Sequence, residues 1–188
     1  MITRLRALHD HLFDAVERHF GPWLPGLLAR VVFAAVLGGY FLNSAMTKIG
    51  PGPLGFLTVT DNAYFQILPP VVEAHGFDVS QVAFLPWGAI VHLGTYAEIV
   101  LPVLIVVGLF TRLAALGMIG FVVVQSLVDI AFHHADDKTI GALFDRFPDS
   151  VILDQRALWM VLLVVLAVRG AGAVSLDRLL ARPGPAAS

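Results

Sequence analysis

Residues 87–109 read WGAIVHLGTYAEIVLPVLIVVGL, a run of mostly apolar side chains. A helix of ~20 such residues crosses the ~30 Å hydrocarbon core of a bilayer, so this run predicts a membrane-spanning helix. Its only acidic residue is Glu98. Placing a charge at that depth costs about 2.5–3.5 kcal/mol on insertion scales, and intramembrane acids therefore usually belong to a pathway or a binding site. Glu98 is thus the first candidate functional residue.

The composition of the whole chain also indicates a membrane protein. Of its 188 residues, 57% are hydrophobic and 14% are charged, and the mean hydropathy is +0.81. One soluble core of this size cannot bury that much apolar surface. The segments predicted to span are residues 23–40, 87–109, 113–132 and 156–173. We therefore predict an all-α integral membrane four-helix bundle over residues 22–174, with short amphipathic interfacial helices.

The fourth predicted span is the shortest of these segments. Its strictly apolar part, residues 157–168, would rise only ~18 Å at ~1.5 Å per residue. Either Arg156 and Arg169 extend their charged ends to the membrane boundary, or the helix continues through Gly170 to Ala173.

Basic residues are distributed unevenly between the two sides of the predicted bundle. One side carries Arg4, Arg6, Arg18, Arg30, Arg112, Arg169, Arg178 and Arg182. The other side carries Lys48, Lys138, Arg146 and Arg156, together with most of the acidic residues. Because short cytoplasmic segments retain lysine and arginine, both termini are predicted to be cytoplasmic.

Terminal segments are predicted to flank the bundle. Residues 1–21 show no signal-peptide pattern and combine apolar residues at roughly helical spacing with arginines, which predicts a retained helix lying on the membrane surface. Residues 175–188 are predicted to form a cytoplasmic tail. In this tail Ser175 caps a short helix with Asp177 in its first turn, and the chain after Arg182 is expected to be disordered.

The two loops on the other side differ in character. Residues 50–86 are long enough for one or two short interfacial helices, and their apolar side chains are expected to pack on the bundle. Residues 135–155 are rich in aspartate. We interpret this second loop as a solvated cover.

Arg30 and Glu98 are predicted to lie at similar depths in the bilayer, if each is measured from the tryptophan that begins its span. An ion pair between them would neutralise two costly charges and hold the first two spans together. The functional alternative is that Glu98, assisted by Arg30, transfers a proton to or from a bound quinone or another small ligand.

A polar stripe follows the third predicted span. Gln125, Asp129 and His133 recur at every fourth position and therefore share one helix face. Since lipid exposure would be costly, we expect the stripe to face inward, toward His92 and Tyr96 of the second span. These side chains would then line a ligand pocket, or form hydrogen bonds that hold helices together.

Metal, thiol and nucleotide chemistry have little support in the sequence. His133, His134 and Asp136 lack the i, i+4 spacing of a preformed metal site, even with His92 added, so no metal site is predicted. The chain has no cysteine, which excludes its own thiol chemistry. It also lacks a phosphate-binding glycine loop after a strand. We expect no nucleic-acid partner.

Two sequence runs carry a resemblance to a known family. Residues 97–116 read AEIVLPVLIVVGLFTRLAAL, and residues 170–180 read GAGAVSLDRLL. The turn over Gly108–Arg112, and the glycine pair before Ser-Leu-Asp, resemble the DoxX family. The first span adds Arg30 near its start and Lys48 within NSAMTKIG after its end.

The resemblance implies an inner-membrane protein similar to small subunits of quinol oxidase and thiosulfate:quinone oxidoreductase. Quinone is then a possible cofactor, and the partner would be a redox enzyme or a second copy of the chain. The candidate ligand-binding residues are Arg30, Lys48, His92, Tyr96, Gln125, Asp129 and His133, with Glu98 as the candidate proton-transfer group. Two alternatives stay open: a small-solute carrier in which buried acids relay protons, and a membrane scaffold without chemistry.

Overall fold

The computed structural model describes residues 2–181, and within this range the chain is helical and contains no β-strand. Four helices in the described range are long and apolar enough to cross a membrane, which makes the chain a multi-pass membrane protein with the predicted helical bundle. Three of these spans are composite: the first and the fourth combine α-helix with a π-helical segment, and the second begins with a kink at Leu85, whose backbone is extended (φ −106°, ψ 126°). The spans are α2 Leu24–Val32, η1 Phe33–Gly38 and α3 Gly39–Met46; η4 Phe84–Gly88 and α6 Ala89–Val107; α7 Thr111–Ala131; and η5 Val151–Gln155 and α9 Arg156–Arg169.

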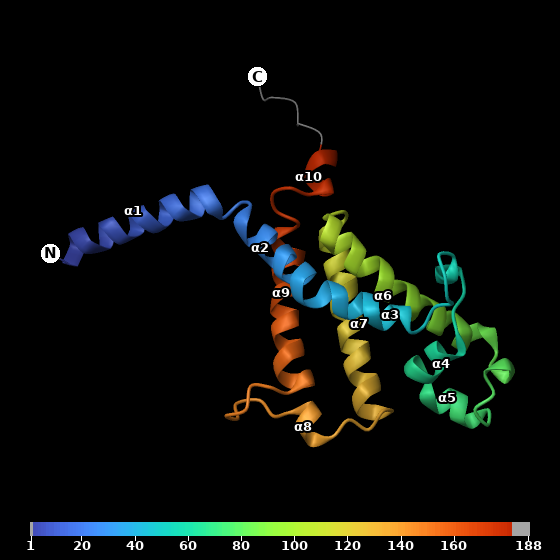
Figure 1. Ribbon diagram of the computed structural model, residues 1–188. Coiled ribbons are helices and arrows are strands. Elements are labelled where there is room, and N and C mark those ends of the chain that lie inside the picture. Colours follow the sequence, from blue (N-terminus) through green and yellow to red (C-terminus); the bar gives the residue numbers. More distant parts are fainter. Residues whose placement is uncertain (1, 182–188) are drawn as a thin grey trace.

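Short helices fill the loops at one end of the bundle, as expected for residues 50–86. They are η2 Gly55–Leu57, α4 Asp61–Ile67, α5 Pro69–Ala74 and η3 Val79–Gln81 in the first loop, and α8 Asp137–Ile140 in the second. At the opposite end, α10 Leu176–Leu180 follows the last span. We call these the α8 end and the α10 end (Figure 1).

The predicted boundaries of two spans were wrong. The first span continues to Met46 rather than ending at residue 40, because a helix accommodates polar side chains near its end. The fourth span runs over Val151–Arg169, not 156–173. It starts early because Ser150 caps it, accepting a hydrogen bond from the backbone N–H of Asp154. It stops at Gly170, whose φ of +77° ends the helix.

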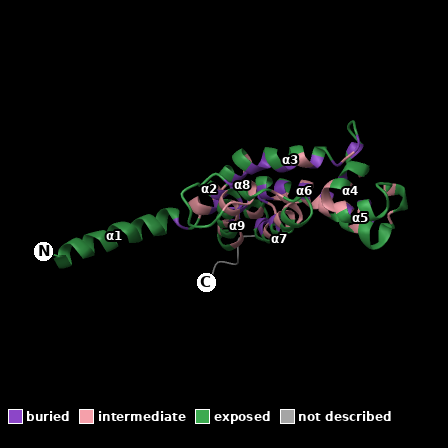
Figure 2. Ribbon diagram, turned by 90° about the horizontal axis from the view of Figure 1, so that it is seen from below, coloured by how far each residue is buried: buried purple, intermediate pink, exposed green. Residues whose placement is uncertain are grey.

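The bundle core forms where the spans face one another. Helix α9 packs against α7 and α2, while α6 packs against α7 and α3. Phe33, Phe41, Met118 and Leu163 are fully buried there. Figure 2 shows the buried residues gathered between the helices and the exposed ones on their outer faces. Those outer faces carry large apolar side chains suited to lipid contact, including Leu28, Val36, Leu93, Leu113, Leu127 and Leu158.

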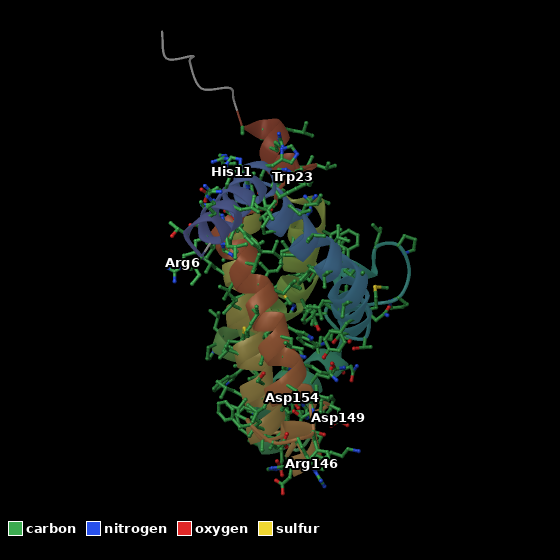
Figure 3. All side chains as sticks on the ribbon, turned by 90° about the vertical axis from the view of Figure 1, so that its left-hand side faces the viewer. Arg6, His11, Trp23, Arg146, Asp149 and Asp154 are labelled. Atoms are coloured by element: carbon green, nitrogen blue, oxygen red, sulfur yellow. The ribbon has the colours of Figure 1, made fainter. Side chains whose placement is uncertain are left out.

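Charged side chains concentrate at the two ends of the molecule. Figure 3 labels Arg6 and His11 near the α10 end, and Arg146, Asp149 and Asp154 at the α8 end. The side chains between these ends are mainly hydrocarbon. This distribution fits a chain whose middle lies in lipid.

The α10 end is held by a compact polar junction. Arg30 donates hydrogen bonds to the backbone carbonyls of Ala173 and Val174. Asp177 accepts from the backbone N–H groups of Phe110 and Thr111, at 2.7 and 3.0 Å. This carboxylate therefore satisfies donors at the start of α7, where the helix dipole also favours a negative charge.

The predicted C-terminal helix is present, with Ser175 accepting a hydrogen bond from the backbone N–H of Arg178. Its first turn is also attached to the start of α7, because the Asp177 carboxylate accepts hydrogen bonds from the backbone there. The chain expected to be disordered after Arg182 lies outside the described residues.

Helix α1, Ile2–Phe20, projects away from the bundle in both Figure 1 and Figure 2. One face is apolar and exposed along its length. It carries Ile2, Leu5, Leu8, Leu12, Phe13, Val16 and Phe20. Its opposite face mixes arginines with acids. The helix forms as predicted, and its position on a membrane surface stays a prediction.

We expect α1 to lie on the bilayer through its leucine-rich face. Burying one leucine contributes about 1.5 kcal/mol or more, so L8E/L12E should speed amide exchange in α1 on the order of a hundred-fold. Hydrogen–deuterium exchange of the full chain in nanodiscs measures this effect. A7E, on the polar face of the same helix, is the control, and equal exchange in both variants would contradict membrane contact.

Candidate functional site

A cavity of about 450 Å³ lies between α3, α6 and α7 toward the α8 end, with α4 beside it. Helices α6 and α7 meet at the turn that joins them and diverge away from it (Figure 1). Small residues Gly94, Ala97, Gly117 and Gly120 line the facing surfaces. Because they fill little of the space between the two helices, a cavity of ligand size remains there.

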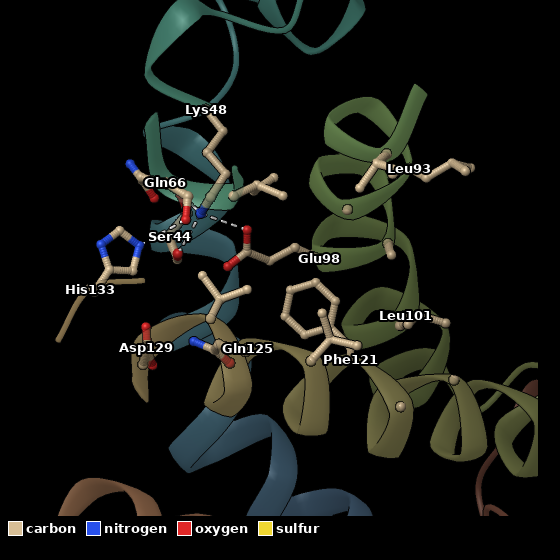
Figure 4. A pocket seen from close by; sticks show the side chains of 18 residues that line it. Ser44, Lys48, Gln66, Leu93, Glu98, Leu101, Phe121, Gln125, Asp129 and His133 are labelled. Atoms are coloured by element: carbon tan, nitrogen blue, oxygen red, sulfur yellow. Dashed lines mark hydrogen bonds and ion pairs between the residues drawn. The ribbon is translucent and has the colours of Figure 1, made fainter. Parts of the chain in front are cut away.

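A buried ion pair forms the polar wall of this cavity. The Lys48 ammonium lies 2.8 Å from a Glu98 carboxylate oxygen, and their side chains are only 7% and 3% exposed. Lys48 also donates to the hydroxyl of Ser44 at 2.8 Å and to its carbonyl at 3.2 Å. Figure 4 shows Glu98 reaching from α6 toward this lysine. The pair ties the end of the first span to the middle of the second.

The predicted pairing of Arg30 with Glu98 was wrong. Arg30 belongs to the α10 junction, where it binds the carbonyls that follow Gly170. Depth along a span says nothing about the direction in which a side chain points, and Arg30 points toward the α9–α10 connection. Lys48 follows the lengthened first span and turns back onto its last turn, which places its ammonium beside Glu98.

A second ion pair borders the cavity. Asp129 of α7 binds Arg156 of α9, and Arg156 also donates to the hydroxyl of Ser126 at 2.9 Å. The Arg156 side chain is only 5% exposed. Sequence reasoning missed this pair because it placed Arg156 at the boundary of the span. The available signal was that Asp129 and Glu98 are the acids inside the predicted spans, so each requires a cationic partner.

The polar stripe faces the cavity, which is lined by Gln125 and Asp129 of α7 and by His133, two residues after that helix ends at Ala131. Gln125 donates to the Tyr40 hydroxyl at 3.1 Å, while its own carbonyl oxygen is buried without a partner. A ring nitrogen of His133 lies 2.9 Å from the backbone carbonyl of Gln66. Tyr40 and Gln66 are therefore neighbours of the site that the sequence pattern did not reveal.

His92 and Tyr96 do not face the stripe, so that expectation was wrong. His92 bonds the carbonyl of Gly88 at 2.8 Å and packs its ring against Phe84 and Tyr96. The reason is helical phase. At ~100° per residue, the face that carries Glu98 points away from positions 92 and 96. Within residues 2–181, no three His, Asp or Glu side chains gather in a group that could hold a metal ion.

The cavity combines two chemical surfaces. Lys48, Glu98, Gln125 and His133 lie at one side, and apolar groups of Leu93, Leu101 and Phe121 line the remainder (Figure 4). The free carboxylate oxygen of Glu98 and the unpartnered oxygen of Gln125 can accept hydrogen bonds. Such an arrangement suits a ligand with an apolar body and a small polar head.

Comparison of the chain with protein-family models, with curated proteins and with solved structures finds no match.

Proposed function

We propose that this chain is a membrane subunit of a quinone-linked redox complex and that its cavity holds a quinone ring or a similar apolar ligand with a polar head. The observation that carries the proposal is the buried Lys48–Glu98 pair on the wall of an otherwise mainly apolar cavity. Intramembrane charges mark functional positions more often than chance placement would. The DoxX-like runs of the sequence favour the same class of protein.

The cavity offers hydrogen-bonding groups of both kinds to such a head. A quinone carbonyl accepts hydrogen bonds, and the imidazolium form of His133 can donate one through Nδ1 while its Nε2 donates to the Gln66 carbonyl. A quinol hydroxyl donates, for which the free oxygens of Glu98 and Gln125 are acceptors. Converting quinone to quinol takes two electrons and two protons. In this proposal both electrons come from a redox-enzyme partner and both protons come from water, with Glu98 relaying at least one of them to the quinone oxygen.

The proposed orientation places both termini in the cytoplasm of a cell with this chain in its inner membrane. The α10 end carries Arg30, Arg112, Arg169 and Arg178, whereas the α8 end carries most of the acids. The cavity would then lie in the outer half of the membrane.

Filling the cavity is expected to weaken ligand binding without unfolding the protein. A side chain added at Gly120 meets no atom within 4 Å, and Gly120 lines the cavity. G120L should therefore weaken binding of a short-chain benzoquinone at least about ten-fold, which corresponds to about 1.4 kcal/mol of lost contact. Titration of the purified chain, with mass spectrometry of co-purified small molecules, measures this.

The matched control is G39L. Gly39 is also helical, exposed and free of neighbours within 4 Å, but it does not line the cavity. Neither leucine should lower stability, because glycine is the poorer helix former. Equal quinone binding by G120L and G39L would contradict the proposed site. Absence of any retained or added quinone would favour a scaffold, and proton-coupled uptake into liposomes would favour a carrier.

The role of Glu98 has its own measurement. E98Q is nearly isosteric, and reduction of a quinone by the native complex should slow if Glu98 transfers the proton. Protein abundance must be compared at the same time, since loss of the ion pair also affects folding. Unchanged turnover at unchanged abundance would rule out proton transfer by this residue.

A further inference from the structure

A second cavity lies at the α10 end, about 760 Å³ in volume. We name it the arginine groove, since Arg112, Arg169 and Arg178 line it. These residues come from the start of α7, the end of α9 and α10, so only the folded chain brings them together. We propose that the arginine groove binds the phosphate of an anionic phospholipid. This proposal does not depend on the proposed quinone site.

Three arginines and one carboxylate line the groove, so its charge is net positive. This carboxylate belongs to Asp177, and its oxygens accept from the backbone of Phe110 and Thr111. Glu17 approaches Arg169 only to 3.8 Å, with both side chains at least half exposed. Within residues 2–181, no carboxylate lies at ion-pair distance from Arg112 or Arg178. Guanidinium groups without a carboxylate partner can bind phosphate oxygens through paired hydrogen bonds.

The position of the groove favours a lipid over a soluble phosphate. It lies at the ends of two membrane spans, and Trp23 forms part of its wall. Tryptophan is enriched at the level of lipid headgroups. Leu113 also lines the groove and is 71% exposed on the outer surface of α7. A headgroup in the groove would therefore place its acyl chains beside lipid-facing side chains, as in other basic pockets between membrane helices.

The test is native mass spectrometry of the full chain with phosphatidylglycerol or phosphatidylcholine added to the detergent. Wild type should retain phosphatidylglycerol preferentially. Each arginine near an anionic headgroup contributes about a five-fold gain in affinity, so R112Q/R178Q should lose about 25-fold. The matched control is R146Q, an exposed arginine at the α8 end, which should bind as wild type does.

The outcomes separate the possible ligands. Equal retention of the two lipids by wild type, or equal phosphatidylglycerol binding by R112Q/R178Q and R146Q, would overturn the proposal. Displacement of the lipid by inorganic phosphate at comparable concentration would also overturn it and indicate a soluble phosphate ligand. All three arginines are exposed, so the variants should fold. If the double variant does not, R169Q carries the same expected direction with about a five-fold loss.

Discussion

Replacing Lys48 with methionine should lower the free energy of unfolding by about 3–5 kcal/mol, because it leaves the Glu98 charge buried without a partner. Methionine keeps most of the length and packing of the lysine side chain. The Glu98 side chain is only 3% exposed, so solvation by water replaces little of the interaction lost with the ammonium. Denaturant unfolding of the purified chain in mixed micelles measures the loss.

The double variant K48M/E98M should recover most of that stability. Removing both charges eliminates the uncompensated group, whereas a pair replaced by apolar residues is often neutral. K138M is the control, since Lys138 is exposed on α8, and it should change stability by no more than about 0.5 kcal/mol. If K48M were as stable as K138M, the buried pair would not contribute to the fold.

The double variant K48M/E98M also tests whether the ion pair has a function beyond stability. A pair retained only to hold helices together can be replaced by methionines with ligand binding unchanged. A pair that binds the head of a ligand cannot, and K48M/E98M should then be stable yet unable to retain a quinone. The same variant therefore separates a scaffold from a ligand-binding subunit.

Substituting Gly108 with alanine should cost about 3 kcal/mol or more. Its φ of +70° costs an L-residue about 1–2 kcal/mol. A Cβ there would also lie 2.1 Å from a guanidinium nitrogen of Arg30 and 2.6 Å from the Cβ of Ser175. Arg30 would have to leave the carbonyls of Ala173 and Val174, and each lost charge-assisted hydrogen bond costs about 1.5–3 kcal/mol. Thermal unfolding in detergent measures the total loss of stability.

Gly52 provides a matched control for this substitution. Its φ is +83°, and a Cβ there meets nothing within 4 Å. G52A should therefore cost only the backbone part, about 1–2 kcal/mol. The difference between the two variants measures the contacts of the α10 junction, and equal losses would show that these contacts are not formed.

The α10 junction explains why several residues of the two DoxX-like runs are required at their positions. Gly108 must be glycine because Arg30 lies against it. Gly172 is equally constrained, since a Cβ there would lie 2.4 Å from both the Leu27 nitrogen and the Trp23 carbonyl oxygen. Asp177 closes the start of α7. These residues lie far apart along the chain but belong to one structural unit.

The sequence by itself determined that this is an all-helical membrane protein. Long apolar runs can satisfy their backbone hydrogen bonds in lipid only as helices or closed barrels, and their length indicates crossing. It also determined that Gln125 and Asp129 share one face of the third span, because i, i+4 spacing fixes a shared face. His133 lies beyond the end of α7 and reaches the cavity through the tertiary fold. The importance of Glu98 followed from the cost of a charge in hydrocarbon.

Only the tertiary structure decided which charges meet. Depth in the bilayer restricts a residue to a level, but the rotation and tilt of each helix decide its neighbour at that level. Glu98 therefore binds Lys48 rather than Arg30, Asp129 binds Arg156, and His92 lies away from the cavity. The cavity itself is also a tertiary property, since it exists where α6 and α7 diverge across small residues contributed by both helices.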